Sequence, residues 1–237
     1  MAASSLALLI AVVAIAAFIQ GSAGMGFALI TVPVFSLIEP ALIPVAVLIL
    51  MLPLNAYVAW RERSAIDWHG ARWITGGRFF GTFAGLWILT VISGRSLELF
   101  IGASTVAAAL LALASPAFTP GRNALVGVGL ITGVTETSTG IGGPPLALVY
   151  QHSRGAKLRA TVAVCFLVGE IISLVVLAVG GSLGNPPVRE TGILLVALLV
   201  GAWLSRFVHH RLDGPIVRIL VLAFSIVSGL AVVIRAW

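Results

Sequence analysis

Two glycine-rich interruptions within apolar segments restrict the folds open to this chain. One covers residues 20–27, Q-G-S-A-G-M-G-F, and the other covers residues 135–145, T-E-T-S-T-G-I-G-G-P-P. Glycine and proline break helices, and lipid offers no hydrogen-bond partner to the backbone groups that are freed. Non-helical backbone at membrane depth is tolerated only inside protein or beside a water-filled cavity. The interruptions therefore predict a polar cavity inside a membrane protein.

The composition requires a membrane around the apolar segments. Of the 237 residues, 59% are hydrophobic and 9% are charged, whereas about a quarter are charged in soluble domains. The mean hydropathy is +1.13. We therefore predict an all-α polytopic membrane protein whose partner is the lipid bilayer. The net charge of +6 comes from basic residues placed singly at segment ends, which excludes a nucleic-acid surface.

The apolar runs give the order of the predicted helices. They cover residues 6–19, 27–38, 40–60, 73–92, 97–114, 124–134, 146–150, 160–179, 192–208 and 216–234. Residues 61–72 and 151–159 are predicted as loops, and residues 115–122 as a connector. The connector divides one transmembrane domain into two halves, residues 1–118 and 119–237.

The two halves carry an internal repeat. Residues 22–26 and 138–142 correspond at a spacing of 116 residues, as do G-L-W at 85–87 and G-A-W at 201–203, and Arg95 and Arg211. Matched interruptions in two halves are typical of transporter sites near the bilayer midplane. We therefore expect the two interruptions to face one another there.

The placement of charge favours a re-entrant hairpin at each interruption. The arms are shorter than the roughly 20 residues that cross a bilayer. If each broken segment returns to its own side, each half crosses three times and the repeats are inverted, with both termini outside. One face then holds Arg61, Arg63, Arg72, Arg122, Arg154, Lys157, Arg159, Arg206 and Arg211, and the other holds Arg95, Arg189 and Arg235. This division follows the positive-inside rule better than the alternative of eight crossings with parallel halves.

The interruptions carry groups that suit a small anion. The arms that begin near Gly26 and Gly142 have free amides with partial positive charge, and glycines let an anion approach the backbone. A structural kink without a ligand is the alternative. The predicted substrate-binding residues are Gln20, Ser22, Gly24, Gly26, Asn55, Thr137, Ser138, Thr139, Gly140, Gly142 and Gly143.

Three charged residues fall at membrane depth. Glu136 and Glu170 are candidates for carrying a proton, because a carboxyl group kept from water can hold one. A structural hydrogen bond is the alternative for both. Arg78 is expected to pair with one of them or with the anion, or else to extend to the nearer membrane surface.

The sequence gives no basis for catalysis, a metal site or a cofactor. Ser22 in Q-G-S-A-G superficially resembles a nucleophile turn, but no histidine lies at membrane depth to serve it. No carboxylate and histidine cluster has ligand spacing, and the single Cys165 excludes an internal disulfide. The histidines, all in predicted loops, are His69, His152, His209 and His210.

Three motifs resemble those of the sulfite exporter TauE/SafE family of membrane transporters. They are G-S-A-G-M-G-F-A-L-I-T-V-P at 21–33, T-G-I-G-G-P-P-L-A-L-V-Y at 139–150 and K-L-R-A-T at 157–161. The first departs from the family's run of consecutive glycines at Met25 and Phe27. The resemblance covers the whole chain. It implies a multi-pass permease of a bacterial-type cell (inner) membrane for sulfur-containing anions such as sulfite, sulfonates or sulfoacetate, often acting as an exporter.

We therefore expect a secondary transporter that works by alternating access. An anion channel, an intramembrane enzyme and a membrane scaffold without a site are the alternatives. The residues leave open which anion is carried, in which direction and with which coupling ion. They also leave the oligomeric state open, a homo-oligomer included.

Overall fold

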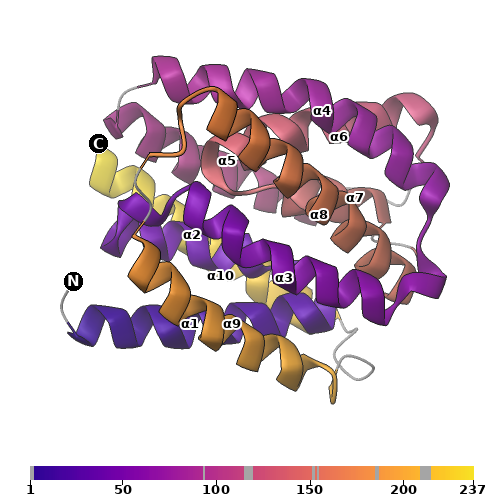
Figure 1. Ribbon diagram of the computed structural model, residues 1–237, viewed down its shortest axis with the longest axis horizontal. Helices are drawn as coiled ribbons and strands as arrows, with labels where there is room; N and C mark the ends of the chain where they lie inside the picture. The colour runs from indigo at the N-terminus through magenta and orange to yellow at the C-terminus, as the bar shows by residue number, and fades with distance from the viewer. Residues whose placement is uncertain are drawn as a thin grey trace.

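The computed structural model describes residues 3–92, 94–114, 120–150, 153, 155–184, 187–208 and 215–237, and the regular elements in these ranges are helical (Figure 1). Six helices in these ranges are long and apolar enough to cross a membrane. The all-α polytopic prediction is confirmed. The first half contains α1 (Ala3–Ala23), α2 (Phe27–Ile38), η1 (Pro40–Leu42), α3 (Val45–Arg61), η2 (Arg63–Ala65), α4 (Trp68–Val91) and α5 (Gly94–Ala114). The second contains α6 (Arg122–Thr139), α7 (Gly143–Tyr150), α8 (Gly155–Val179), α9 (Val188–Ser205) and α10 (Pro215–Ala236).

α4 and α8 each begin five residues earlier than the sequence predicts. α4 begins at Trp68 because Asp67 Oδ1 accepts a hydrogen bond from the Gly70 amide at 3.0 Å and caps the helix. α8 begins at Gly155, so its first turns contain two basic residues that were predicted in a loop. The predicted loop residue His69 is helical and exposed. Other predictions fall outside the described residues, namely those for the connector at 115–119 and for His152, Arg154, His209, His210 and Arg211.

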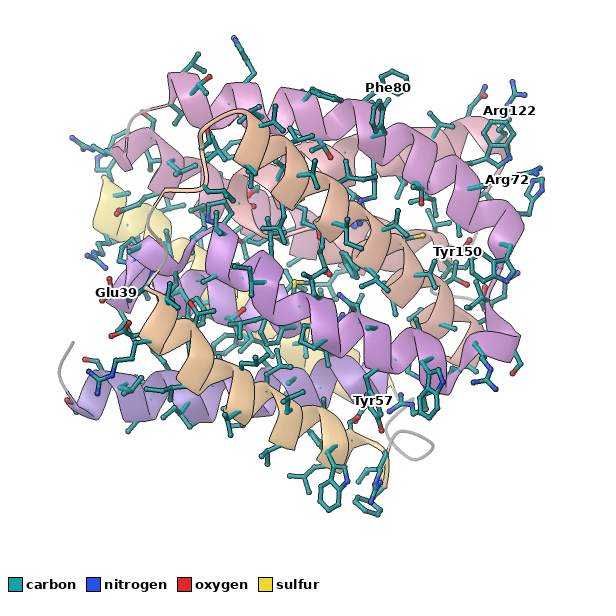
Figure 2. All side chains as sticks on the ribbon, in the orientation of Figure 1. Glu39, Tyr57, Arg72, Phe80, Arg122 and Tyr150 are labelled. Atoms are coloured by element: carbon teal, nitrogen blue, oxygen red, sulfur yellow. The ribbon has the colours of Figure 1, made fainter. Side chains whose placement is uncertain are left out.

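Each interrupted segment folds back toward the side from which it starts. The start of α1 and Glu39, which follows α2, lie on the same side as the C-terminus, whereas Arg122 and Tyr150, at the two ends of the α6–α7 segment, lie on the opposite side (Figures 1 and 2). Gly26 precedes α2 with φ 127°, and Gly140 ends α6 with φ 81°. Glycine takes such conformations at little cost, so both turns follow directly from the sequence.

Helices of the two halves pack in matched pairs. α1 packs on α9 and its counterpart α6 packs on α4, while α2 packs on α10 and its counterpart α7 packs on α5. α3 packs on its own counterpart α8, and α5 on α10. Each of these contacts therefore has an equivalent in which the two halves exchange roles.

Glycines let α4 and α6 approach backbone to backbone. A Cβ atom added to Gly81 would meet the Leu130 carbonyl, and one added to Gly129 would meet the Ile74 carbonyl. Small-residue faces of this kind let membrane helices associate without a hydrophobic drive. The other glycines with equivalent approaches are Gly77, Gly85 and Gly133.

Replacing Gly81 by leucine is expected to destabilise the α4–α6 pair, because the added side chain overlaps the α6 backbone. Overpacking of this kind costs about 1–3 kcal/mol or more. The matched control is Gly76→Leu, since a Cβ atom added to Gly76 has nothing within 4 Å. The measurement is the thermal unfolding midpoint of the purified protein in detergent. Equal midpoints for the two variants would contradict the packing described.

Candidate transport site

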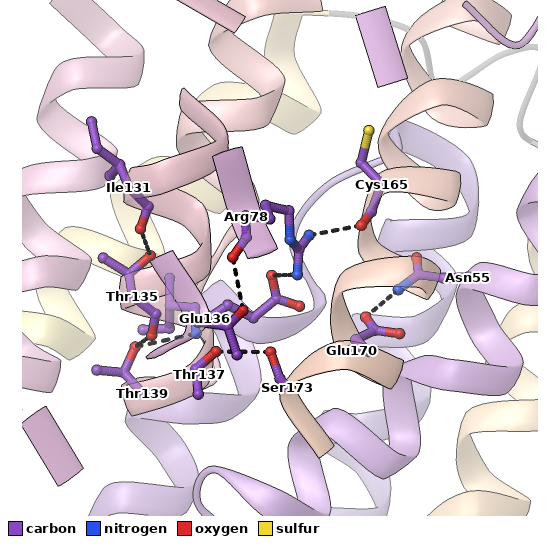
Figure 3. Close-up of polar contacts among 12 residues, drawn as sticks. Asn55, Arg78, Ile131, Thr135, Glu136, Thr137, Thr139, Cys165, Glu170 and Ser173 are labelled. Carbon is purple, nitrogen blue, oxygen red and sulfur yellow. Dashed lines mark hydrogen bonds and ion pairs between the residues drawn. The ribbon is translucent and has the colours of Figure 1, made fainter. Parts of the chain in front are cut away.

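A fully buried ion pair joins α4 to α6. Arg78 Nη2 donates to Glu136 Oε2 at 2.5 Å, and Arg78 Nη1 donates to the Cys165 carbonyl of α8 at 2.9 Å (Figure 3). Both side chains of the pair are 0% exposed. The structure therefore pairs Arg78 with a glutamate instead of extending it to the surface.

The guanidinium of Arg78 lies directly against α8. A Cβ atom added to Gly169 would overlap guanidinium atoms, and the Phe166 ring centroid lies 5.6 Å from Arg78 Cζ. A desolvated cation over an aromatic ring is stabilised by the ring's negative face. Gly169 and Phe166 are absent from the sequence predictions. The signal for Gly169 is its position next to the intramembrane Glu170.

A hydrogen-bonded chain connects Glu170 to the first hairpin. Asn55 Nδ2 donates to Glu170 Oε1 at 2.6 Å, and Gln20 Nε2 donates to Asn55 Oδ1 at 3.3 Å. Gln20 Oε1 accepts from the Phe27 amide at 3.2 Å, at the start of α2. These three hydrogen bonds therefore link the first turn of α2, through Gln20 of α1 and Asn55 of α3, to Glu170 of α8.

The hydroxyl groups of the second interruption bond within the protein. Thr137 Oγ1 and Ser173 Oγ of α8 are 2.8 Å apart (Figure 3). Ser138 and Thr139 donate to carbonyls of their own helix, and Thr139 Oγ1 also accepts from the Ile141 amide at 3.2 Å. Thr137 is thus the residue of this group that reaches across to another helix.

The spacing of 116 residues also relates Gln20 to Glu136. Gln20 meets the first amide of α2, and the Glu136 carboxylate lies beside Gly142, just before α7. The same place in the two hairpins therefore carries a neutral amide in one half and a carboxylate in the other. This difference makes the two halves chemically unequal at the site.

The two turns were expected to face one another, but in the structure they do not. Gly140 lies against Val47 near the start of α3, whereas Gly24 lies against Arg159, which pairs with Glu62 just after the end of α3. The turns therefore lie near opposite ends of α3, because α1 has 21 residues and is long enough to carry its turn across most of a bilayer. The amides at the turns were predicted to be free, but two of them are not. The Phe27 amide donates to Gln20 and the Ile141 amide donates to Thr139.

Several buried polar atoms around the cluster have no hydrogen-bond partner within the described part of the chain. A buried polar atom without a partner costs about 1–3 kcal/mol, so such atoms mark places where a proton, water or a ligand belongs. The atoms at these two turns and between them are Ser22 Oγ, Arg61 Nε, Arg78 Nε, Thr132 Oγ1, Glu136 Oε1 and Glu170 Oε2.

A polar cavity of about 490 Å³ lies near the ends of α4, α6, α7 and α8. Lys157 Nζ lies 3.1 Å from Asp67 Oδ2, and the Tyr150 hydroxyl donates to the same oxygen at 3.4 Å. Burial raises the pKa of Asp67, but the Gly70 amide and Lys157 outweigh it and hold that pKa below its ordinary value. Asp67 is therefore ionised at neutral pH, and its negative charge balances the positive charge of Lys157 in this cavity.

Broken helices around a buried polar cluster in a helical membrane domain are typical of membrane transporters. The model of the sulfite exporter TauE/SafE family matches residues 9–232 of the 237. The chain belongs to this family, and the resemblance of its motifs is confirmed. Comparisons with curated proteins and with solved structures give no match.

Proposed function

We propose that this protein exports a small sulfur-containing anion, such as sulfite, a sulfonate or sulfoacetate, by alternating access and without chemical conversion. The family supports a membrane transporter of sulfur anions. The observation that carries the mechanism is the hydrogen-bonded chain from Gln20 through Asn55 to Glu170. Because this chain ties the first hairpin to α8, which also holds Arg78 through Cys165, movement at one hairpin changes contacts at the other.

The path of the anion follows from the separation of the turns. Ser22, Gly24 and Gly26 lie at one turn and would contact the anion near one end of α3. Gly140, Gly142 and Gly143 lie at the other turn and would contact it near the opposite end, with Thr137, Ser138 and Thr139 beside them. Gln20 and Asn55 lie between the turns. Each turn would thus meet the anion in a different stage of transport.

The balance of charge supports coupling to a proton. Arg78, Glu136 and Glu170 are all 0% exposed. Two carboxylates and one guanidinium leave one uncompensated negative charge, and a buried uncompensated charge is strongly destabilising. A proton on one carboxyl group removes that charge. We assign the proton to Glu170, whose hydrogen bond comes from the neutral amide of Asn55 rather than from the arginine.

Inverted repeats with both termini outside would place Arg72 and Arg122 in the cytoplasm and Glu39 outside. The test is single cysteines at these three positions, labelled in intact cells with a membrane-impermeant maleimide. In intact cells, labelling is expected only for the cysteine at position Glu39. The cysteines at positions Arg72 and Arg122 are expected to react only after the cells are lysed. Cys165 is buried, so the parent chain is the control. Labelling of all three positions in intact cells would reject the orientation.

Flux measurements in proteoliposomes test the proposed function. Radiolabelled sulfite, sulfate and ethanesulfonate are loaded, and efflux is followed with and without a pH gradient. Saturable efflux that is accelerated by unlabelled anion on the opposite side is expected of a carrier. Non-saturating flux would indicate a channel. A chemically altered product without flux would indicate an enzyme, and neither flux nor product would leave the scaffold alternative.

A further inference from the structure

Two arginines hold the turn between α1 and α2. Arg61, the last residue of α3, donates from Nη2 to the Gly21 carbonyl at 2.6 Å. Arg159, in the second turn of α8, donates from Nη1 to the Ser22 carbonyl at 3.4 Å. The Arg159 side chain is 2% exposed, although residues 151–159 were predicted to form a loop. A buried arginine at this place requires an anion beside it.

In this structure the anion is the carboxylate of Glu62. Arg159 Nε donates to its two oxygens at 2.9 and 3.0 Å, and Arg61 Nη2 donates to Oε1 at 2.9 Å. Two guanidinium groups therefore meet one carboxylate beside the first turn. A carboxylate that accepts from arginine donors occupies the place that the oxygens of another anion can take.

Unpartnered donors point to the same place. The Ser22 side chain is 0% exposed, and its hydroxyl has no hydrogen-bond partner in the described residues. The buried Nε atom of Arg61 has no partner there either. Both residues lie at the turn that Arg159 contacts. A hydroxyl and guanidinium groups are the donors that oxyanions accept most readily.

We propose that Arg61, Arg159 and Ser22 form a binding site for a small oxyanion, and that Glu62 occupies this site until the substrate displaces it. The proposal rests on the transport function proposed above and names further residues of its site. Glu62 follows the end of α3 and its side chain is 9% exposed, so it already touches solvent, where water replaces its contacts once it is displaced. A dianion such as sulfate or sulfite then accepts hydrogen bonds from both arginines in place of the carboxylate.

The first variant that tests the site is Glu62→Gln, which removes the competing charge but keeps the shape of the side chain. Binding of sulfite, sulfate and ethanesulfonate to the purified protein is measured by isothermal titration calorimetry. Because a hydrogen bond to a charged group contributes about 1.5–3 kcal/mol, the dissociation constant is expected to fall by at least about tenfold. An unchanged dissociation constant would overturn the proposal.

The second variant is Arg159→Lys, which keeps the charge but loses the planar fork of donors. It is expected to weaken binding by at least about tenfold, and unchanged binding would also overturn the site. The control is Arg63→Gln, since Arg63 stacks on Trp60 with its Cζ 6.0 Å from the ring centroid and lies outside the described contacts with the turn. If the wild-type protein shows flux but anion binding is unchanged in Glu62→Gln and Arg159→Lys, this site alone is rejected. Absence of wild-type flux rejects the proposed transport function instead.

Discussion

Gly142→Ala is expected to abolish anion transport, whereas Gly143→Ala is expected to reduce it far less. A Cβ atom at Gly142 would overlap Glu136 Oε2, so this carboxylate must leave Arg78. Breaking a buried ion pair costs about 3–5 kcal/mol. A Cβ atom at Gly143 would lie 3.9 Å from the Phe166 ring, which is an ordinary contact. The two neighbouring glycines therefore separate an effect on the ion pair from a general effect on the turn.

The measurement is efflux from proteoliposomes that contain equal amounts of each variant, with a monodisperse gel-filtration profile as evidence of insertion and folding. Efflux is expected to fall by more than about a hundredfold for Gly142→Ala, since 3 kcal/mol corresponds to that factor. Gly142→Val is expected to behave in the same way. Gly140→Val adds the strain of a side chain at φ 81° to a contact with Val47. Normal efflux in the Gly142 variants would remove the second turn from the site.

The breaks in the helices were predictable because their cause is local. Glycines at 24, 26 and 140 take positive φ values that other residues adopt only with strain. The hydrophobic content, together with interruptions at matched spacing, was sufficient to predict a polytopic protein with two broken hairpins. These features depend on short stretches of sequence and on the properties of lipid, so no knowledge of distant contacts was needed.

The sequence predicted a glutamate as one possible partner of Arg78, but which glutamate it pairs with was not predictable, because this depends on which helices pack together. The pairing of Arg78 with Glu136 requires the close approach of α4 and α6, and no local sequence pattern identifies α6 as the partner of α4. The link from Gln20 to Glu170 similarly requires α3 to lie between α1 and α8. The repeat spacing did contain one unused signal, the correspondence of Gln20 with Glu136.

The position of the first turn was the largest difference from the sequence prediction. α1 continues through Ala23, four residues beyond the predicted apolar run, and its turn therefore reaches the basic start of α8. Arg159 was assigned to a loop because basic residues near segment ends are usually solvated. Its burial arises from contact with a turn 137 residues away in the sequence, at Ser22, which no local pattern indicates.

Glu170→Gln is expected to uncouple transport from the pH gradient while leaving the protein folded. Glutamine has nearly the shape of glutamic acid, and its carbonyl oxygen can accept the hydrogen bond from Asn55 Nδ2 that Glu170 Oε1 accepts at 2.6 Å. The variant carries no titratable proton at this position. The remaining charges, Arg78 and Glu136, balance each other, so no uncompensated buried charge destabilises the fold.

Two assays on the same proteoliposomes separate coupling from binding. Efflux driven by an imposed pH gradient is expected to fall to the rate without a gradient. The reason is that the variant lacks the proton whose movement is coupled to that of the anion. Exchange of labelled for unlabelled anion at equal pH needs no net proton movement and is expected to persist. The control is Glu39→Gln, which removes a partly exposed carboxylate at the end of α2 and should leave both rates unchanged. A Glu170→Gln variant that still responds to the gradient would show that the proton is carried elsewhere, and Glu136 would then be the remaining carboxyl group of the cluster. Loss of exchange together with loss of gradient-driven efflux would instead show that Glu170 holds the transport path together and does not carry the proton alone.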